Sequence, residues 1–304
     1  MKRIAIVGIG RWGKNLVREF SKFSIISKCI TTGNPENIKW LKKNYPKILI
    51  STNIDEILND NNIDAIVIAT PIKSHYKIIK SALESGKHVF VEKPMTQSIL
   101  QANDLIKIAK RKKLCLFVGY VFLHNQIFEK IKKINEKEFI KNMNFDWKKF
   151  GTFDEDIFEN LLSHELSINL ELFGIPNKIN LLSTSSFITS VDSFYIKLNY
   201  NKNRQSNINI DRIINYKKKV VTISTKKNFY VWDDDQLFKL NNKTKSFQLI
   251  FQSSTSPLYQ ECKNFIFEIT NNKPTINSAI LDKNITIIVS KLKVKQKKLK
   301  INKF

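Results

Sequence analysis

Cysteine is scarce in this chain of 304 residues, and its three copies, Cys29, Cys115 and Cys262, lie far apart. Without a CxxC pair or the dense spacing of secreted disulfide scaffolds, the sequence favours reduced thiols and a cytoplasmic location. No apolar run is long enough to cross a bilayer, and glycines interrupt the first residues, MKRIAIVGIG, too early for a signal peptide. No pair of histidines or cysteines has metal-ligand spacing. We therefore expect a soluble protein with no membrane segment and no metal.

Acidic residues are also few, with 27 Asp and Glu against 51 Lys and Arg, which gives a net charge of +24. Taken alone, this charge suggests a nucleic-acid partner. However, only six of the 51 basic residues are arginine, the residue that forms bidentate contacts to bases and phosphates. The lysines are dispersed apart from a basic C-terminal stretch, Lys291–Lys303. We expect a solvated lysine surface and no nucleic-acid partner, and keep a basic nucleic-acid binder as a minor alternative.

Glycine occurs eight times, and three copies form one G-x-G-x-x-G motif. The motif follows a short apolar run, residues 2–7, and opens a helical pattern over residues 11–23, which is the context that distinguishes a dinucleotide site from a chance match. The first glycine permits a tight turn, the second lets the backbone approach a pyrophosphate, and the third lets helix and strand pack closely. The pyrophosphate then lies at the helix N-terminus, where free N–H groups favour anions. The motif residues are Gly8, Ile9, Gly10, Arg11, Trp12 and Gly13.

Strand and helix patterns alternate up to residue 118, which predicts right-handed βαβ units and a parallel sheet. The pattern then changes: a helix over 125–134, a helix over 156–173, four alternating strands and two final helices. The sequence therefore predicts an α/β protein with an N-terminal Rossmann sheet in residues 1–120 and a C-terminal α+β domain with an open, mostly antiparallel sheet in residues 121–304. The four strands expected in the second domain cover 193–200, 208–216, 220–224 and 229–232.

The end of the second expected strand, Ile30-Thr31-Thr32-Gly33-Asn34, lacks the acidic residue that commonly binds the adenosine ribose. A carboxylate there would repel a 2′-phosphate, so its absence leaves NADP open. Thr32 or Asn34 could bind either cofactor through neutral hydrogen bonds, and Lys39 or Lys28 could meet a 2′-phosphate. We expect NAD or NADP, with a slight preference for NADP.

Three further motifs stand between residues 69 and 125: Ala69-Thr70-Pro71 followed by His75, Glu92-Lys93-Pro94 at a strand end, and VGYVFLHN at 118–125. With the glycine motif, they resemble the glucose–fructose oxidoreductase and inositol dehydrogenase family (Gfo/Idh/MocA). The resemblance covers the first domain and the helix around His164, and it fades over the C-terminal strands. It implies a dehydrogenase acting on sugars, and subunits that associate as a homodimer or homotetramer through the open sheet.

Lys93 lies at the carboxyl end of a parallel strand, where such sheets bind ligands. An ammonium there can stabilise the alkoxide that develops on a substrate as hydride leaves, and the resemblance implies that role. It also implies that Glu92 and Thr70-Pro71 lie beside the nicotinamide ribose, and the Lys93–Pro94 bond can be cis at little cost. Besides the glycine motif, the cofactor-binding residues that we expect are Thr32, Ala69, Thr70, Pro71, His75, Glu92 and Lys93.

The second catalytic group is expected on the helix over 156–173. Family members carry Asp-x-x-x-His there, a spacing that places both side chains on one helix face, with the histidine as acid/base and the aspartate orienting it. In this chain His164 fits, but Asn160 occupies the aspartate position, where it can accept an N–H bond yet supplies no charge. Asp156 or Glu165 could compensate. Of the other histidines, we expect His124 near the substrate.

The resemblance implies hydride transfer to or from a secondary alcohol or ketone of a small-molecule sugar or nucleotide-linked sugar, with Lys93, His164 and Asn160 in the catalytic group. Because Asn160 replaces the usual acid, a non-catalytic member of the family that binds the cofactor for sensing or assembly is the alternative.

Overall fold

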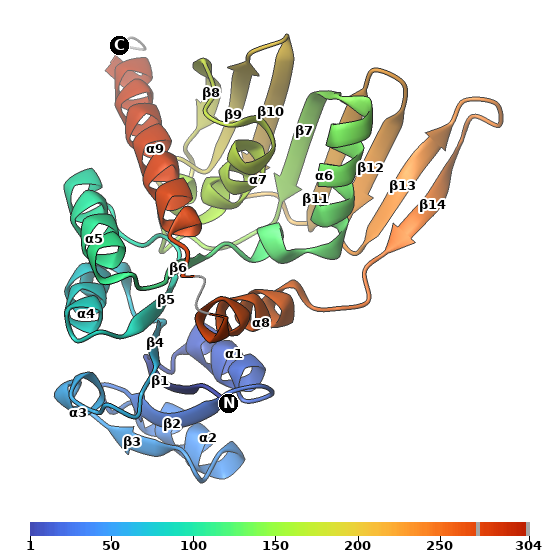
Figure 1. Ribbon diagram of the computed structural model, residues 1–304. Helices are drawn as coiled ribbons and strands as arrows, with labels where there is room; N and C mark the ends of the chain where they lie inside the picture. The colour runs from blue at the N-terminus through green and yellow to red at the C-terminus, as the bar shows by residue number, and fades with distance from the viewer. Residues whose placement is uncertain (272–273, 302–304) are drawn as a thin grey trace. The chain divides into compact units, whose positions relative to one another are not determined.

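The computed structural model describes residues 1–271 and 274–301 (Figure 1). The chain forms two compact units. The first contains Met1–Val121 and Pro257–Thr286, and the second contains Phe122–Ser256 and the chain from Ile287. The sequence-based division made one cut after residue 120 and placed all later residues in the second domain. The structure differs in returning Pro257–Thr286 to the first unit, because this segment buries apolar side chains, Phe265 among them, in that unit's core.

The first unit is built on a six-stranded sheet in the order β3-β2-β1-β4-β5-β6, with every neighbouring pair parallel. The strand order continues outward on both sides of β1 and β4, which is the arrangement of a Rossmann fold. The predicted parallel sheet is confirmed. Its strands are β1 (Arg3–Val7), β2 (Ile25–Ile30), β3 (Leu49–Ser51), β4 (Ala65–Ile68), β5 (His88–Glu92) and β6 (Leu116–Gly119).

Two helices of this unit, α2 and α5, begin at residues whose side chains cap the first turn. Asn34 accepts the N–H of Asn37 at the start of α2, and Ser98 accepts that of Gln101 at the start of α5. In the core, the Phe265 ring contacts the rings of Phe20, Phe90 and Phe117 edge to face, so the sheet and the returning segment share one apolar cluster. The helices are α1 (Arg11–Phe20), α2 (Pro35–Asn44), α3 (Asp55–Leu58), α4 (Ile72–Glu84), α5 (Ile99–Lys112), α8 (Pro257–Thr270) and the first part of α9 (Asn277–Ile301).

The second unit is built on an eight-stranded sheet in the order β14-β13-β12-β11-β7-β10-β9-β8. Only the β7–β10 pair is parallel, so the mostly antiparallel sheet is confirmed. The structure places β9 at the predicted residues, whereas β7, β8, β13 and β14 were not predicted. The strands are β7 (Ile140–Lys148), β8 (Lys178–Ser185), β9 (Ser193–Tyr200), β10 (Arg204–Asp211), β11 (Lys218–Thr225), β12 (Phe229–Asp233), β13 (Gln236–Asn241) and β14 (Ser246–Gln252).

The two faces of this sheet differ in chemistry. On one face, alternate side chains such as Phe145, Ile208 and Ile223 are buried, and Figure 1 shows α6 (Gln126–Glu138) and α7 (Ser163–Phe173) over the sheet. On the other face, Asn144 exchanges hydrogen bonds with side chains of the neighbouring strands. The 3₁₀ turn Val121–His124 precedes α6, and the π turn Phe158–Leu162 runs directly into α7.

Candidate active site

The glycine loop between β1 and α1 has the conformation that its sequence predicts. Gly8 has φ +91°, and a Cβ there would lie 2.7 Å from the carbonyl oxygen of Ala69. A Cβ on Gly13 would lie 2.1 Å from the carbonyl oxygen of Gly8. A Cβ on Gly10 would meet no atom within 4 Å. Gly8 and Gly13 are therefore required by the fold itself, whereas Gly10 is required only if something else approaches the loop.

The first turn of α1 presents its backbone N–H groups without a side-chain acceptor. Its N-cap is Gly10, which offers no side chain, and the first turn contains no acidic residue. Such a helix start favours an anion through its N–H groups and its dipole. The open space above Gly10 and the uncapped N-terminus together fit the pyrophosphate of a dinucleotide.

The end of β2 narrows the choices for the adenosine side of the cofactor. Asn34 uses its side-chain oxygen to cap α2, at 3.0 Å from the Asn37 nitrogen. The Lys28 ammonium lies 2.6 Å from Glu56 Oε2. Thr32 and Lys39 are exposed at this edge, so of the groups considered from the sequence they remain the candidates for ribose and phosphate contacts.

His75 connects the loop that follows β4 to the loop that follows β5. Its ring is buried, with Nε2 2.8 Å from the carbonyl oxygen of Thr70 and Nδ1 3.0 Å from that of Pro94, which follows a cis Lys93–Pro94 bond. Burial lowers the pKa of His75, although these carbonyl contacts oppose the shift. A neutral ring carries one N–H and donates to one carbonyl at a time. The structure thus assigns His75 to holding the Thr70 and Lys93 segments in register.

Glu92, at the end of β5, joins the glycine loop to the Lys93 segment. Its Oε1 accepts a hydrogen bond from the indole N–H of Trp12. A Cβ on Gly119 would lie 3.4 Å from Glu92 Oε1 and 3.5 Å from Oε1 of Glu261 on α8, so the two carboxyl groups converge beside this glycine. Burial raises the pKa of Glu92 to about 7, with the Trp12 hydrogen bond and the charge of Lys93 opposing the shift. Burial and the charge of Glu92 also raise the pKa of Glu261.

Sequence reasoning missed Asp282 of α9, a second acid of this region. It is fully buried, and it accepts the Tyr120 hydroxyl at 2.6 Å and the Met95 N–H at 3.2 Å. Burial raises its pKa to about 7, with both hydrogen bonds and the charge of Lys93 opposing the shift. Asp282 thereby fixes the backbone just after Lys93–Pro94. The only sequence signal is an acid within the apolar face of a helix.

In the second unit, His164 is the second residue of α7, and this helix follows directly after the π turn Phe158–Leu162. A π turn closes five residues along the chain rather than four, so Glu159 as well as Asn160 lies about one turn before the imidazole. The ring of Phe122 contacts the His164 ring edge to face, with 5.1 Å between centroids. Asn160 and His164 thus lie on the two sides of a junction between a π turn and an α-helix, which the sequence did not predict.

The structure gives other partners to the two carboxylates that were expected to compensate for Asn160. Asp156 accepts the N–H groups of residues 158 and 159 at 3.0 Å each, and its Oδ2 lies 3.0 Å from the Lys293 ammonium. Glu165 is buried, and its Oε1 lies 3.4 Å from the ammonium of Lys219. Each of these two acids is therefore matched by a lysine.

His124 is held in the 3₁₀ turn before α6, which Asn125 caps by accepting the N–H of Ile127 at 2.7 Å. Burial lowers the pKa of His124 to about 4, and the charge of Lys132 adds to the shift. This histidine is therefore neutral near pH 7.

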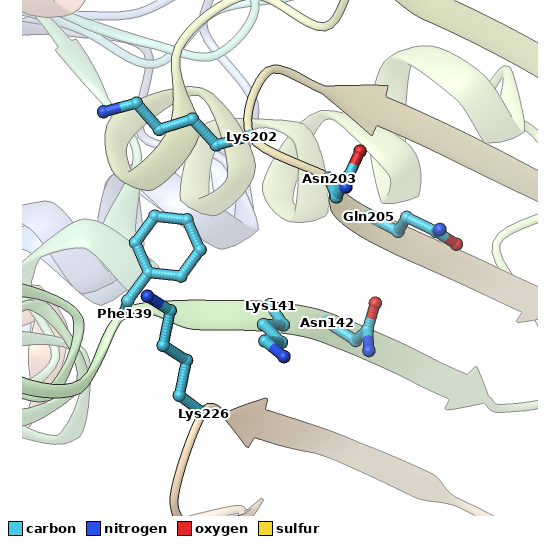
Figure 2. Close-up of a pocket in the computed structure, with 7 residues that line it drawn as sticks. All are labelled: Phe139, Lys141, Asn142, Lys202, Asn203, Gln205 and Lys226. Atoms are coloured by element: carbon cyan, nitrogen blue, oxygen red, sulfur yellow. The ribbon is translucent and has the colours of Figure 1, made fainter.

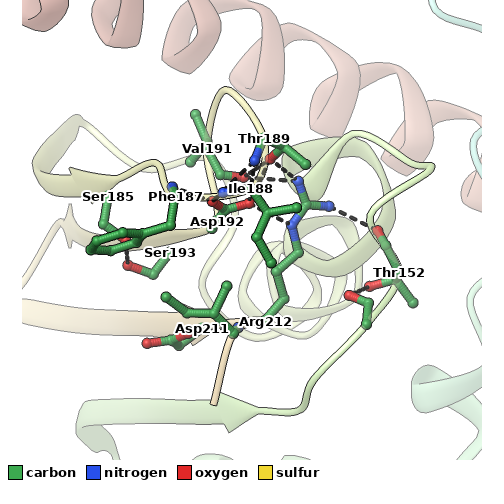
Figure 3. A network of polar contacts seen from close by, with 12 residues as sticks. Thr152, Ser185, Phe187, Ile188, Thr189, Val191, Asp192, Ser193, Asp211 and Arg212 are labelled. Carbon is green, nitrogen blue, oxygen red and sulfur yellow. Dashed lines mark hydrogen bonds and ion pairs between the residues drawn. The ribbon is translucent and has the colours of Figure 1, made fainter. Parts of the chain in front are cut away.

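A network around Arg212 holds the segment that leads into the π turn (Figure 3). The buried guanidinium donates to the carbonyl oxygens of Thr152 and Glu155, at 2.8 Å each, and to that of Val191 at 2.9 Å. Asp192, whose side chain is fully buried, accepts the N–H groups of residues 187–189. Although burial opposes it, these hydrogen bonds hold the pKa of Asp192 well below its usual range. Arg212 therefore positions the approach to the His164 helix.

A hollow of about 650 Å³ at the edge of the second sheet contains none of the predicted site residues (Figure 2). It is lined by Phe139, Lys141, Asn142, Lys202, Asn203, Gln205 and Lys226. Among residues 1–271 and 274–301, no group of three or more His, Cys, Asp or Glu side chains is arranged to hold a metal ion. In the same part of the chain, no helix is long and apolar enough to cross a bilayer.

In the comparison with known proteins, the family model covers the N-terminal part of the chain. Residues 2–120 match the family model described as an oxidoreductase family with an NAD-binding Rossmann fold, GFO_IDH_MocA. The scyllo-inositol 2-dehydrogenase (NADP(+)) IolW of Bacillus subtilis is 28% identical over 194 residues, which cover 58% of this chain and 53% of that protein. The UDP-N-acetylglucosamine 3-dehydrogenase of Acidithiobacillus ferrooxidans is 21% identical over 218 residues, or 70% of this chain and 67% of that protein.

A solved structure of the latter enzyme, GnnA, superposes with a TM-score of 0.87 over 96% of both chains at 17% identity, which shows a shared fold. The aligned segments cover about half of the IolW relative's length. The resemblance read from the motifs is confirmed for the first domain: residues 2–120 match the NAD-binding Rossmann fold of the Gfo/Idh/MocA oxidoreductase family.

Proposed function

We propose that this protein is an NAD(P)-dependent oxidoreductase that transfers a hydride to or from a secondary alcohol or ketone of a sugar or nucleotide-linked sugar. The observation that carries the proposal is the hydrogen bond from Trp12 to Glu92. It joins the anion-binding start of α1 to the strand end that presents Lys93, so one rigid unit holds both the dinucleotide loop and a cationic group. Bound nicotinamide would accept or supply the hydride.

The residues of this chain then handle the proton and the developing charge. The Lys93 ammonium hydrogen-bonds the reacting oxygen of the substrate and stabilises its alkoxide form. His164 takes the hydroxyl proton in the oxidative direction and returns it in the reductive direction. Asn160, about one turn earlier, orients the imidazole without adding charge. Glu92 and the Thr70-Pro71 segment, braced by His75, shape the surroundings of the nicotinamide ribose.

The substrate class is supported by the relatives, which are named as dehydrogenases of an inositol and of a nucleotide-linked amino sugar. For the cofactor, we propose NADP over NAD, because residues 30–34 at the end of β2 include no carboxylate to repel a 2′-phosphate, and Thr32 there and Lys39 of α2 are exposed. We place the protein in the cytoplasm, since Cys29, Cys115 and Cys262 are free thiols buried in the fold.

We also propose a homodimer or homotetramer. The outer strand β14 exposes Phe247, Leu249 and Ile250, between 45% and 51% each, beside a sheet face that no helix of the second unit covers in Figure 1. Apolar side chains gathered at one sheet edge commonly mark an interface. Light scattering at high protein concentration should give a mass of at least two chains, and a monomer there would contradict this part of the proposal.

The alternative is a cofactor-binding protein without turnover, which Asn160 favours because it removes the usual acid beside the histidine. The two are separated by incubating the purified protein with NAD⁺ or NADP⁺ and a panel of inositols and nucleotide sugars, and following absorbance of the reduced nicotinamide. Turnover with any member supports the oxidoreductase. Cofactor binding by fluorescence titration, with no turnover across the panel in either direction, supports the alternative.

A further inference from the structure

Lys219 occupies a core position of the second sheet. On β11 it has the same parity as Val221 and Ile223, which are 4% and 0% exposed and face the helices. Its side chain is 20% exposed. Lys218, the preceding residue, points to the opposite face, where its side chain is 43% exposed and its ammonium lies 2.7 Å from Asp146 Oδ2. An apolar residue is the ordinary occupant of the Lys219 position, so a cation there requires specific partners.

The Lys219 ammonium contacts two groups. It lies 3.4 Å from Oε1 of the buried Glu165 and 3.2 Å from the centroid of the Phe122 ring. Phe122 in turn contacts the His164 ring. Burial lowers the pKa of Lys219, and the negative charge of Glu165 opposes the shift. The cation and the proposed acid/base are thus separated by one aromatic ring, with Glu165 next to His164 in the helix.

The charges around His164 are arranged in matched pairs. Asp156 lies just before the π turn and Glu159 lies within it, and both contact the Lys293 ammonium of α9. Glu165 is matched by Lys219 from the sheet. Asn160 is neutral, and His124 of the 3₁₀ turn is neutral near pH 7. Further out, Asp234 and Lys217 act on Lys219 with opposite signs.

We propose that Lys219 is a positioning residue for the proton-transfer step: it neutralises Glu165, so that the residue next to His164 in the helix carries no unmatched charge, and it packs on Phe122, which contacts the imidazole. The inference rests on the proposed function for its catalytic meaning. Its physical content does not: removing Lys219 frees the Glu165 charge and favours imidazolium, whereas removing the Glu165 charge leaves the cation and favours the neutral ring. The two single changes therefore act in opposite directions on the same histidine.

The test is an NMR titration of His164 in the whole protein labelled with ¹³C-histidine, which needs no substrate. The chain has four histidines, and His164→Gln assigns the signal. We expect Lys219→Met to raise the titration midpoint of His164 by about one pH unit and Glu165→Gln to lower it by about as much, as charges at this separation require. The double variant Lys219→Met/Glu165→Gln should return close to the starting midpoint, and Lys219→Arg should leave it unchanged.

Lys218→Met is the matched control, because it removes a lysine from the same strand on the opposite face, and it should not move the midpoint. If Lys219→Met does not fold, Glu165→Gln and the double variant still decide the sign. A His164 midpoint that is the same in all variants, or that moves in one direction in both single variants, overturns the proposal. Where a sugar substrate is found, the pH–rate profile should shift with the NMR midpoint. A shift in the NMR midpoint without any turnover supports the inference about Lys219 and counts against the oxidoreductase.

Discussion

The indole N–H of Trp12 donates a hydrogen bond to the carboxylate of Glu92 across two loops of the Rossmann sheet. Trp12 lies in the glycine motif and Glu92 precedes Lys93, so this contact ties the glycine loop to the strand end that carries Lys93. A Cβ on Gly119, beside Glu92 and Glu261, would lie 3.2 Å from the Phe90 ring, so this junction is tightly packed. Trp12, Glu92 and Gly119 meet at one junction. Substitutions on its two sides should therefore affect cofactor binding and turnover differently.

Gly10→Val should abolish cofactor binding and leave the fold intact. The Gly10 Cβ would meet no protein atom within 4 Å, and the glycine has an ordinary φ of −66°, so the new side chain enters only the space that the pyrophosphate needs. Fluorescence titration with NADPH should show at least a 100-fold weaker affinity, with an unchanged circular dichroism melt. Gly13→Ala is the contrasting variant: its Cβ would lie 2.1 Å from the Gly8 carbonyl, so it should lower the melting temperature. NADPH affinity unchanged in Gly10→Val would refute the assignment of the loop.

Lys93→Ala should remove turnover while cofactor affinity changes little. The ammonium is proposed to act on the reacting oxygen, and loss of such a stabilising group costs roughly 10²–10³ in kcat. Steady-state rates and NADPH titration on the same preparation check both halves of the expectation. Lys80→Ala is the control, since Lys80 is a half-exposed lysine of the same unit, paired with Asp104. A kcat in Lys93→Ala close to that of Lys80→Ala would remove Lys93 from the mechanism.

Sequence patterns located the cofactor half of this site because its constraints are local. A strand that ends in Gly8, and another that ends in Glu92-Lys93-Pro94, are each bounded by residues with special backbone conformations, here φ +91° and a cis bond. Glycine and proline at the ends of strands can be recognised in a single sequence. β9 likewise appears at the predicted residues, since its alternating pattern ends at polar residues on both sides.

What the sequence did not reveal depends on distant packing. Glu261 and Asp282 reach the Rossmann unit from α8 and α9, and no local pattern announces that these helices return to it. Lys219 stands in a run of three lysines, 217–219, and only the strand register shows that it faces the core. The π turn before His164 has no sequence signature of its own. Strand β14 exposes most of its side chains, so its sequence does not show the alternation of apolar and polar residues that marks a half-buried strand.

The stability of the protein should fall as pH rises through 7. Burial raises the pKa of Glu92, Glu268 and Asp282 to about 7, above the ordinary values near 4 of an unfolded chain. Each group therefore binds a proton more tightly when folded, a contribution that is complete below about pH 4 and is lost as pH rises through 7. Thermal unfolding should show a melting temperature roughly 5 °C lower at pH 8 than at pH 6.

Asp282→Asn tests the contribution of Asp282 to that profile. The amide oxygen can still accept the Tyr120 hydroxyl and the Met95 N–H but does not ionise, so the decline between pH 6 and pH 8 should become shallower. Glu56→Gln is the control, because Glu56 is exposed and its pKa is lowered by Lys28, which confines its effect to acidic pH. A melting temperature that is level or rising from pH 6 to pH 8 in the unmodified protein would contradict the assignment.

The sharpest prediction concerns Asn160. If His164 transfers the proton, His164→Ala should reduce kcat by roughly 10²–10⁴, as loss of a general base does. Asn160→Asp restores an acid about one helical turn before the imidazole, which favours its protonated form. Since Asp156 and Glu159 are held by Lys293 and Glu165 by Lys219, the new carboxylate is unmatched, and the pH optimum of the oxidation reaction should move upward. Asn160→Leu is the control for packing: it adds no charge, so it should change the rate without moving the optimum. An optimum that stays in place in Asn160→Asp, together with normal turnover in His164→Ala, would show that proton transfer does not take place on this helix.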